Sequence, residues 1–142
     1  MNTTWLIDAG PLVALLVASD VHHRWATEQL RLSPPIVLTC DAVISEALFL
    51  LKREGHNCDD LFALAEAGFL RSAFDFGAEH PAVRMLMRRY ASLPMSFADA
   101  CLVRMAELHP GVPVFTLDGD FRLYRKNRRE VIPTIMPAES HP

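Results

Sequence analysis

Apolar residues in this chain occur in short runs, separated by longer stretches in which they recur every three or four positions. Short apolar runs are typical of buried strands, and the wider spacing is typical of amphipathic helices. The runs predict four strands and a weaker fifth, at 4–7, 36–39, 70–74, 113–117 and 131–135.

The stretches between these runs predict helices that begin after turn or capping residues. They cover 12–18, 23–32, 41–53, 59–67, a segment from His80 or Pro81 to Ser92, and 96–108. Asp41 and Asp59 are the expected caps of two of them. Strands that alternate with helices predict an α/β fold whose parallel sheet is covered on both faces. With no repeats or linkers, we expect one domain over residues 1–136 and a mobile tail over 137–142.

Four acidic residues stand where a folded protein normally places apolar ones. Asp8 and Asp118 end two of the predicted strands, while Glu46 and Asp99 lie in apolar helical stretches. An isolated buried carboxylate is costly, and the carboxyl ends of parallel strands share one edge of a sheet. We therefore expect these carboxylates to converge on a common partner, for which a divalent cation is the simplest choice.

Each acidic residue also has an ordinary structural interpretation. Asp8 suits a helix cap, and Ser96 with Asp99 resembles a capping box. The pair Asp118-Gly119, followed by Asp120, suits a simple turn. Glu46 is the hardest to explain in this way, because its helical neighbours three and four residues away are all apolar, namely Ala42, Val43, Phe49 and Leu50.

Composition and charge bound the possible partners. The chain has 142 residues, 51% of them hydrophobic, and that surplus suits either a thick core or a dimer interface. The net charge of −3 argues against general attraction to nucleic acid. Setting aside the four acids and Asp120 leaves 12 acidic against 14 basic residues, a slightly basic remainder.

Basic residues concentrate directly after the last acidic pair. Five of eight positions are basic, namely Arg122, Arg125, Lys126, Arg128 and Arg129. Such a cluster either contacts phosphates or forms a solvated face. A second basic group comprises Arg84, Arg88 and Arg89. Tyr124, within the first cluster, suits packing better than stacking on a base.

The remaining signals indicate a cytoplasmic protein. Three cysteines, at positions 40, 58 and 101, show no paired spacing and are expected to be buried free thiols in a reducing compartment. The N-terminal apolar run lacks the features of a signal peptide. No uncharged stretch reaches the length needed to cross a membrane.

Four segments together resemble the motifs of PIN-domain nucleases, in the same order. They are Ile7-Asp8-Ala9-Gly10-Pro11-Leu12, Val43-Ile44-Ser45-Glu46, Ser96-Phe97-Ala98-Asp99-Ala100 and Phe115-Thr116-Leu117-Asp118-Gly119-Asp120-Phe121. Small members of this family are commonly VapC-like toxins of toxin–antitoxin pairs. The resemblance implies a three-layer α/β/α fold with a central parallel sheet of four or five strands. It also implies cleavage of RNA that depends on Mg²⁺ or Mn²⁺.

The resemblance assigns roles to the acidic residues, and oxygen-rich sites suit such hard cations. Asp8 and Asp99 are the expected principal metal ligands. Glu46 and Asp118 are expected to complete the catalytic set, as ligands directly or through water, or by orienting the attacking water. Asp120 is a supporting member of the metal site.

Substrate binding is expected from Thr116, Arg122, Arg125 and Lys126. The implied partners are an RNA substrate, a cognate antitoxin and a second copy of the chain in a homodimer.

A catalytically inactive PIN-like binding module, or an RNA-processing nuclease outside a toxin–antitoxin pair, stays open as an alternative. A haloacid-dehalogenase-like phosphatase does not fit, because only 22 residues follow Asp120. A nucleotide-binding domain is disfavoured, because the chain has no glycine-rich phosphate loop.

Overall fold

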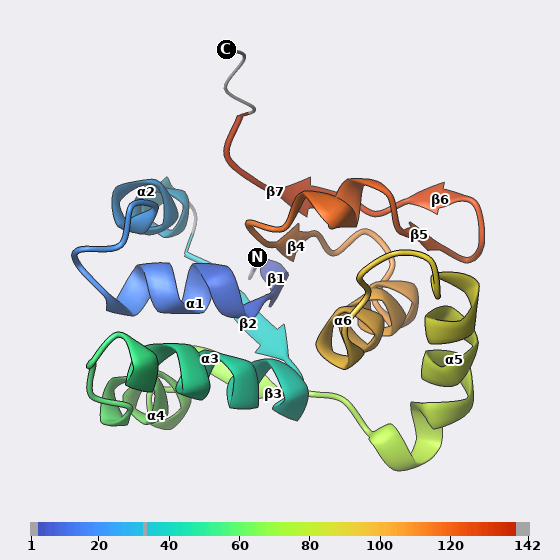
Figure 1. Ribbon diagram of the computed structural model, residues 1–142. Coiled ribbons are helices and arrows are strands. Elements are labelled where there is room, and N and C mark those ends of the chain that lie inside the picture. Colours follow the sequence, from blue (N-terminus) through green and yellow to red (C-terminus); the bar gives the residue numbers. More distant parts are fainter. Residues whose placement is uncertain (1–2, 33, 139–142) are drawn as a thin grey trace.

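Five parallel strands form the centre of the computed structural model, which describes residues 3–32 and 34–138 (Figure 1). The strand order is β3-β2-β1-β4-β7, and every neighbouring pair is parallel. The strands are β1 (Thr4–Ile7), β2 (Ile36–Thr39), β3 (Leu70–Ser72), β4 (Val114–Phe115) and β7 (Thr134–Ile135). The sheet therefore has the predicted class, and β1 lies at its middle.

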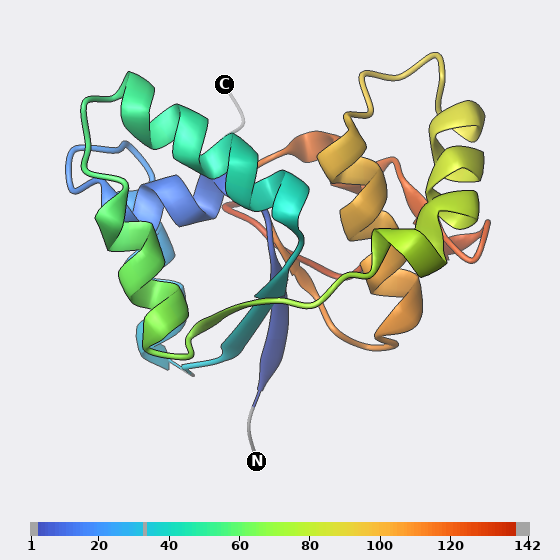
Figure 2. The same cartoon turned by 90° about the horizontal axis from the view of Figure 1, so that it is seen from below.

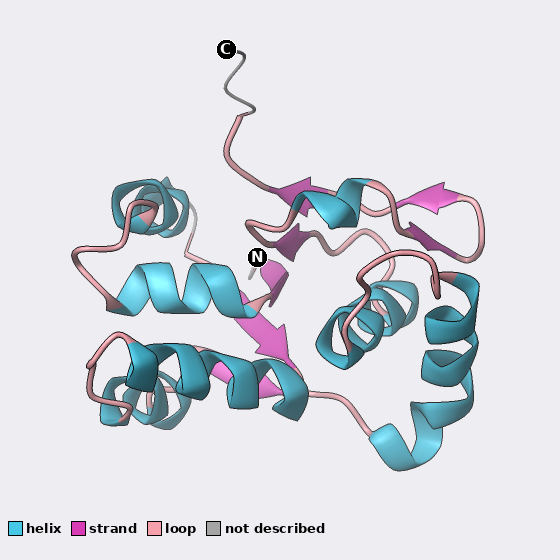
Figure 3. Ribbon diagram, in the orientation of Figure 1, coloured by secondary structure: helices cyan, strands magenta, loops and turns pink. Residues whose placement is uncertain are grey.

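Helices cover both faces of this sheet, as Figures 2 and 3 show. One side carries α1 (Ala9–Leu16), α2 (His23–Leu32), α3 (Asp41–Arg53) and α4 (Asp59–Glu66). The other side carries α5 (Phe76–Arg89) and α6 (Phe97–Leu108). This arrangement is the three-layer α/β/α fold that the resemblance implied.

Burial on both faces explains why the first strand is almost wholly apolar. Leu6 and Ile7 have no exposed surface, and Trp5 packs edge-on against Phe115 of β4 with 5.3 Å between ring centroids. Trp25 from α2 meets the same Phe115 ring at 5.4 Å. The aromatic cluster joins the sheet to the α2 side of the core.

Several helix boundaries differ from those predicted. The residues before α3 and α4 are Cys40 and Cys58, so Asp41 and Asp59 are first-turn residues rather than caps. Helix α5 starts at Phe76, before the expected His80 or Pro81, because the Asp75 side chain accepts a hydrogen bond from the backbone N–H of Ala78. Pro81 is thus inside the helix, which ends at Arg89 instead of Ser92.

The segment after β4 contains structure that the sequence did not predict. A 3₁₀ turn, η1 (Gly119–Arg122), leads into an antiparallel hairpin of β5 (Arg125–Lys126) and β6 (Glu130–Val131). The expected strand over 131–135 is therefore divided between this hairpin and β7. The expected mobile tail falls largely on residues 139–142, which lie outside the described residues.

No helix among the described residues is long and apolar enough to span a bilayer. All three cysteines are free thiols; Cys40 and Cys101 are buried, whereas Cys58 is only partly buried.

Candidate functional site

A cleft of about 270 Å³ opens where β1 and β4 end. Four elements bring an acidic side chain to it: the end of β1, helix α3, the start of α6 and the segment after β4. Its lining residues are Asp8, Gly10, Glu46, Leu50, Asp99, Leu117 and Asp118. The structure thus brings together the four carboxylates that are far apart in the sequence.

Asp8 is both a helix cap and a wall of the cleft. One carboxylate oxygen, Oδ1, accepts a hydrogen bond from the Ala9 N–H at 2.8 Å, and Oδ2 accepts one from the Thr116 hydroxyl at 2.8 Å. The same Thr116 oxygen accepts a bond from the Asp118 N–H at 3.0 Å. One hydroxyl therefore holds the first and fourth acidic motifs in a fixed relation.

Asp99 likewise combines a structural role with exposure to the cleft. It forms the predicted capping box with Ser96, whose hydroxyl accepts a bond from the Asp99 N–H at 3.0 Å. Its Oδ2 accepts bonds from the Ser96 N–H at 3.2 Å and from the Tyr124 hydroxyl at 3.1 Å. The side chain is 94% buried and still lines the cleft. The capping interpretation and the site interpretation are therefore compatible.

Glu46 and Asp118 occupy the more open part of the cleft. Glu46 lies on the exposed side of α3, which explains how a charged residue is tolerated among apolar helical neighbours. Asp118 precedes η1, and its Oδ1 accepts a bond from the Asp120 N–H at 2.9 Å. Its other carboxylate oxygen has no hydrogen bond from a described residue.

The described lining of the cleft concentrates negative charge. Burial raises the pKa of Asp8 to about 6, against hydrogen bonds from Thr116 and Ala9 that lower it. Burial also raises the pKa of Glu46 and of Asp99, and neighbouring carboxylates add to both shifts. No Lys, Arg or His is among the described residues that line the cleft.

This donor set fits a hard divalent cation that keeps part of its water shell. No three Asp, Glu, His or Cys side chains in the described part of the chain already surround one metal-sized position. Mg²⁺ typically binds through one or two carboxylates and several waters, so it does not need such a cage. The raised pKa values of Asp8, Glu46 and Asp99 support the conclusion that these residues suit a divalent cation, because a cation would stabilise their charged forms.

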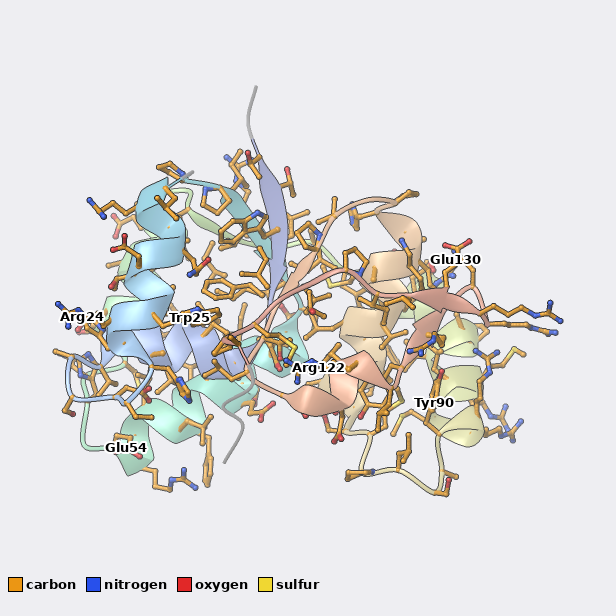
Figure 4. All side chains as sticks on the ribbon, turned by 90° about the horizontal axis from the view of Figure 1, so that it is seen from above. Arg24, Trp25, Glu54, Tyr90, Arg122 and Glu130 are labelled. Carbon is orange, nitrogen blue, oxygen red and sulfur yellow. The ribbon has the colours of Figure 1, made fainter. Side chains whose placement is uncertain are left out.

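The other predicted site residues lie in different surroundings. Thr116 is fully buried beside Asp8. Asp120 is half-buried in η1 and does not line the cleft. Arg122 is exposed on η1 (Figure 4), outside the cleft lining. The Arg125 guanidinium donates to the carbonyl oxygens of three preceding residues, 122 to 124, at 2.7–3.3 Å.

Lys126 is 93% buried, and it too lies away from the cleft lining. The predicted binding role of these basic residues therefore stays a prediction.

Tyr124 is a contributor to the site that the sequence did not identify. It has no exposed surface, which confirms packing over base stacking, yet its hydroxyl donates to a cleft carboxylate. The rings of Tyr90 and Phe121 lie edge-on to it at 5.2 and 5.3 Å. Nothing in the local pattern distinguished this tyrosine from an ordinary core aromatic.

The family model of the PIN domain matches residues 5–127 of the chain. The match covers most of the sequence and includes all four acidic motifs. The chain belongs to the PIN-domain family.

Among solved structures, the chain is similar to the crystal structure of VapC20 from Mycobacterium tuberculosis, described as a toxin that cleaves the sarcin–ricin loop. The two share 26% sequence identity with a TM-score of 0.72, over 92% of this chain and 100% of that one. A comparison with curated proteins finds no significant match. The likeness to VapC20 confirms the predicted VapC-like PIN fold.

Proposed function

We propose that this PIN domain is a metal-dependent endoribonuclease that acts as the toxin of a toxin–antitoxin pair. The observation that carries the proposal is the convergence of four carboxylates on one cleft, whose described lining includes no Lys, Arg or His. The similarity to a VapC toxin, which reaches across nearly the whole chain, supports the same conclusion.

Each acidic residue has a distinct part in the proposed reaction. Asp8 and Asp99 are the most buried and most firmly held by hydrogen bonds, so they suit the fixed ligands of Mg²⁺ or Mn²⁺. Such an ion lowers the pKa of a bound water and stabilises charge on the attacked phosphate. Glu46 has a raised pKa at the open side of the cleft, where it can accept a proton from the attacking water. Asp118 completes the acidic wall.

Substitution of the buried ligands tests the proposal. We expect Asp8→Asn and Asp99→Asn to lower cleavage of an RNA stem-loop that carries the sarcin–ricin sequence by about 10²–10⁴-fold. EDTA should abolish cleavage by the unmodified protein. Glu66→Gln, which removes an exposed acid on α4, is the matched control.

Cleavage that survives both substitutions would reject the site. RNA binding without cleavage in any sample would favour the alternative of a binding module. The retention of all four acidic positions favours the enzyme. A small neighbouring reading frame that encodes an antitoxin would support the toxin role, and its absence would favour another RNA-processing role.

We also propose that the chain forms a homodimer through an apolar groove of about 510 Å³. Its lining residues follow one side of α5, continue just past its end and include the first residue of α6: Phe76, His80, Val83, Arg84, Met87, Arg88, Ala91 and Phe97. Phe76 and Phe97 are about half exposed and pack edge-on at 5.6 Å. A seam as long as a helix suits packing against its own copy about a two-fold axis.

Sedimentation equilibrium would test this dimer. Met87→Glu places a charge in the groove and should yield monomers, whereas Met85→Glu, on the same helix but outside the groove, should leave the dimer intact. Because Arg84 and Arg88 of both copies would approach each other, added salt should strengthen association. An unmodified protein that sediments as a monomer would exclude the dimer.

We also propose a cytoplasmic location for the protein. The three free thiols agree with it.

A further inference from the structure

We propose that the β5–β6 hairpin presents a phosphate-binding surface for RNA, outside the acidic cleft. The surface, called here the basic edge, consists of Arg89, Arg128 and Arg129. The proposal rests on the proposed nuclease function for its substrate class. Within the basic cluster that follows the fourth acidic motif, it assigns RNA backbone contacts to Arg128 and Arg129, together with Arg89, rather than to Arg122 and Arg125.

The β5–β6 hairpin is attached to the residue that follows α5. The backbone N–H of Arg125, where β5 begins, donates to the Tyr90 hydroxyl at 2.9 Å. Tyr90 directly follows α5, so the start of the hairpin is tied to the end of that helix, and Figure 1 shows the two next to each other. Arg89, at the end of that helix, and the hairpin arginines thus belong to one side of the molecule. Figure 4 shows nitrogen-tipped side chains that project outward there.

Exposed arginines determine the charge of the basic edge. Arg89, Arg128 and Arg129 are all exposed, and within the described residues none of them pairs with a carboxylate. The one nearby acid on the hairpin is Glu130, which accepts a weak bond from the Asn127 side chain at 3.5 Å. The buried Lys126 adds a further positive charge behind the surface. The basic edge therefore carries a net positive charge.

The tip of the hairpin has an unusual backbone conformation. Asn127 and Arg128 have φ values of 48° and 72°, in the left-handed region. Asparagine tolerates this region, but an arginine there is costly, and glycine is the usual choice. The turn is held in place because the Asn127 N–H donates to the Glu107 carboxylate of α6 at 2.6 Å. A strained arginine on an anchored turn indicates that its side chain is useful there.

The basic edge also indicates the kind of partner. Exposed guanidinium groups on two adjacent elements suit phosphate oxygens, which they can bind with two hydrogen bonds each. Glu107 lies eight residues after Asp99 on α6, about 12 Å farther along the helix axis. The basic edge is thus separated from the cleft, and it would contact phosphates several nucleotides from the bond that is cut. An extended or structured RNA fits this separation.

Binding can be measured in EDTA, where no cleavage occurs, by fluorescence anisotropy of a labelled 25-nucleotide RNA stem-loop. We expect the double variant Arg128→Gln/Arg129→Gln to weaken binding about tenfold at 0.1 M salt. The slope of log affinity against log salt should fall by about 1.4–1.8, the value for two lost phosphate contacts. Arg24→Gln/Arg53→Gln removes the same charge from exposed arginines on α2 and α3, far from the hairpin, and should leave the slope unchanged.

Arg128→Gly separates binding from folding. Glycine relieves the left-handed backbone, so this variant should melt about 2–4 °C higher while it binds RNA more weakly. A lower melting temperature would contradict the argument from strain. Equal loss of slope in the hairpin variant and in the α2–α3 control would show that only net charge matters and would overturn the proposal.

Three further outcomes separate the possibilities. If the hairpin variant binds RNA normally but loses binding to a labelled Glu-rich peptide, the surface serves an acidic protein segment and the proposal fails. If the unmodified protein cleaves RNA but the hairpin variant keeps the same salt slope, the basic edge is refuted and the nuclease function is not. If the hairpin variant shows the expected loss of binding but the unmodified protein does not cleave RNA in Mg²⁺, the nuclease function is refuted and the basic edge is not.

Discussion

Two groups of carboxylates lie at opposite ends of helix α6, and they differ in whether a basic side chain contacts them. Near the C-terminal end, Glu79 and Glu107 share Arg104 at 2.8 and 3.2 Å, and Glu107 also accepts the N–H of Asn127. At the N-terminal end, Asp99 joins the other cleft acids, and the described residues that line the cleft include no Lys, Arg or His. The first group is thus compensated by an arginine in contact with it, whereas the described lining of the second group supplies no positive charge.

The difference shows how a structural acidic cluster can be told from a functional one. Acidic residues from different elements meet in both groups, so the mere presence of such a cluster does not separate them. What separates them is compensation by a cation. Asp8, Glu46 and Asp99 of the cleft group have raised pKa values, and they stay close together at a cost that an external cation would remove.

The largest expected effect follows from the Asp8 carboxyl of the metal-free protein. Its pKa is about 6 in the folded chain against 3.8 for an unperturbed group, so protonation favours the folded state. This contribution is fully present below about pH 3.8 and is lost as the pH rises to about 6. Two pKa units correspond to about 3 kcal/mol.

Urea unfolding in EDTA would measure this dependence. Asp8→Asn should flatten the decline between pH 4 and 6 and should make the metal-free protein more stable than the unmodified one at pH 7. Mg²⁺ should stabilise the unmodified protein and have little effect on the variant. A variant that is less stable at pH 7 would show that Asp8 is compensated after all.

A smaller effect is expected where the compensated cluster is broken. Arg104→Leu keeps the apolar stem but leaves Glu79 and Glu107 without a cation, which should lower the free energy of unfolding by about 2 kcal/mol. We expect Mg²⁺ not to restore it, because one Glu107 carboxylate oxygen still accepts the Asn127 N–H. Denaturation with and without Mg²⁺ measures both quantities, and recovery by Mg²⁺ would remove the distinction between the two groups.

The smallest expected effect concerns the hydrogen bond that holds Asp99. Tyr124→Phe removes the hydroxyl donor and keeps the buried ring, so it should raise the Mg²⁺ concentration needed for half-maximal stabilisation about tenfold. Tyr90→Phe, which loses only a bond from the Arg125 N–H, is the matched control. Equal Mg²⁺ titrations of the two variants, followed by melting temperature, would show that Tyr124 acts through packing alone.

Much of the fold was predictable because burial leaves a direct record in the sequence. β1 and β2 match the predicted ranges, since strands covered on both faces read as unbroken apolar runs. The start of α5 was placed too late, at His80 or Pro81, because the cap at Asp75 was not recognised and a proline was expected in the first turn. The β5–β6 hairpin was missed because its turn contains no glycine.

The candidate site was predictable to a different degree for acids and bases. Carboxylates in apolar surroundings stand out, and all four lie at the cleft. The basic cluster was expected around the same cleft, but the chain turns away after η1, and Arg125 bonds to its own backbone. The Tyr124 contact depends on that turn, which no local pattern specified.

The hydroxyl of Thr116 has a consequence for how the protein folds during its synthesis. It joins Asp8 to Asp118, and it reaches Asp8 only when β4 has paired with β1. A contact across 108 residues cannot form early in synthesis, when only the first strands have left the ribosome. The nascent chain therefore stays without an assembled acidic cleft until its fourth motif has emerged, so any activity that needs all four carboxylates must wait until nearly the whole chain has been made.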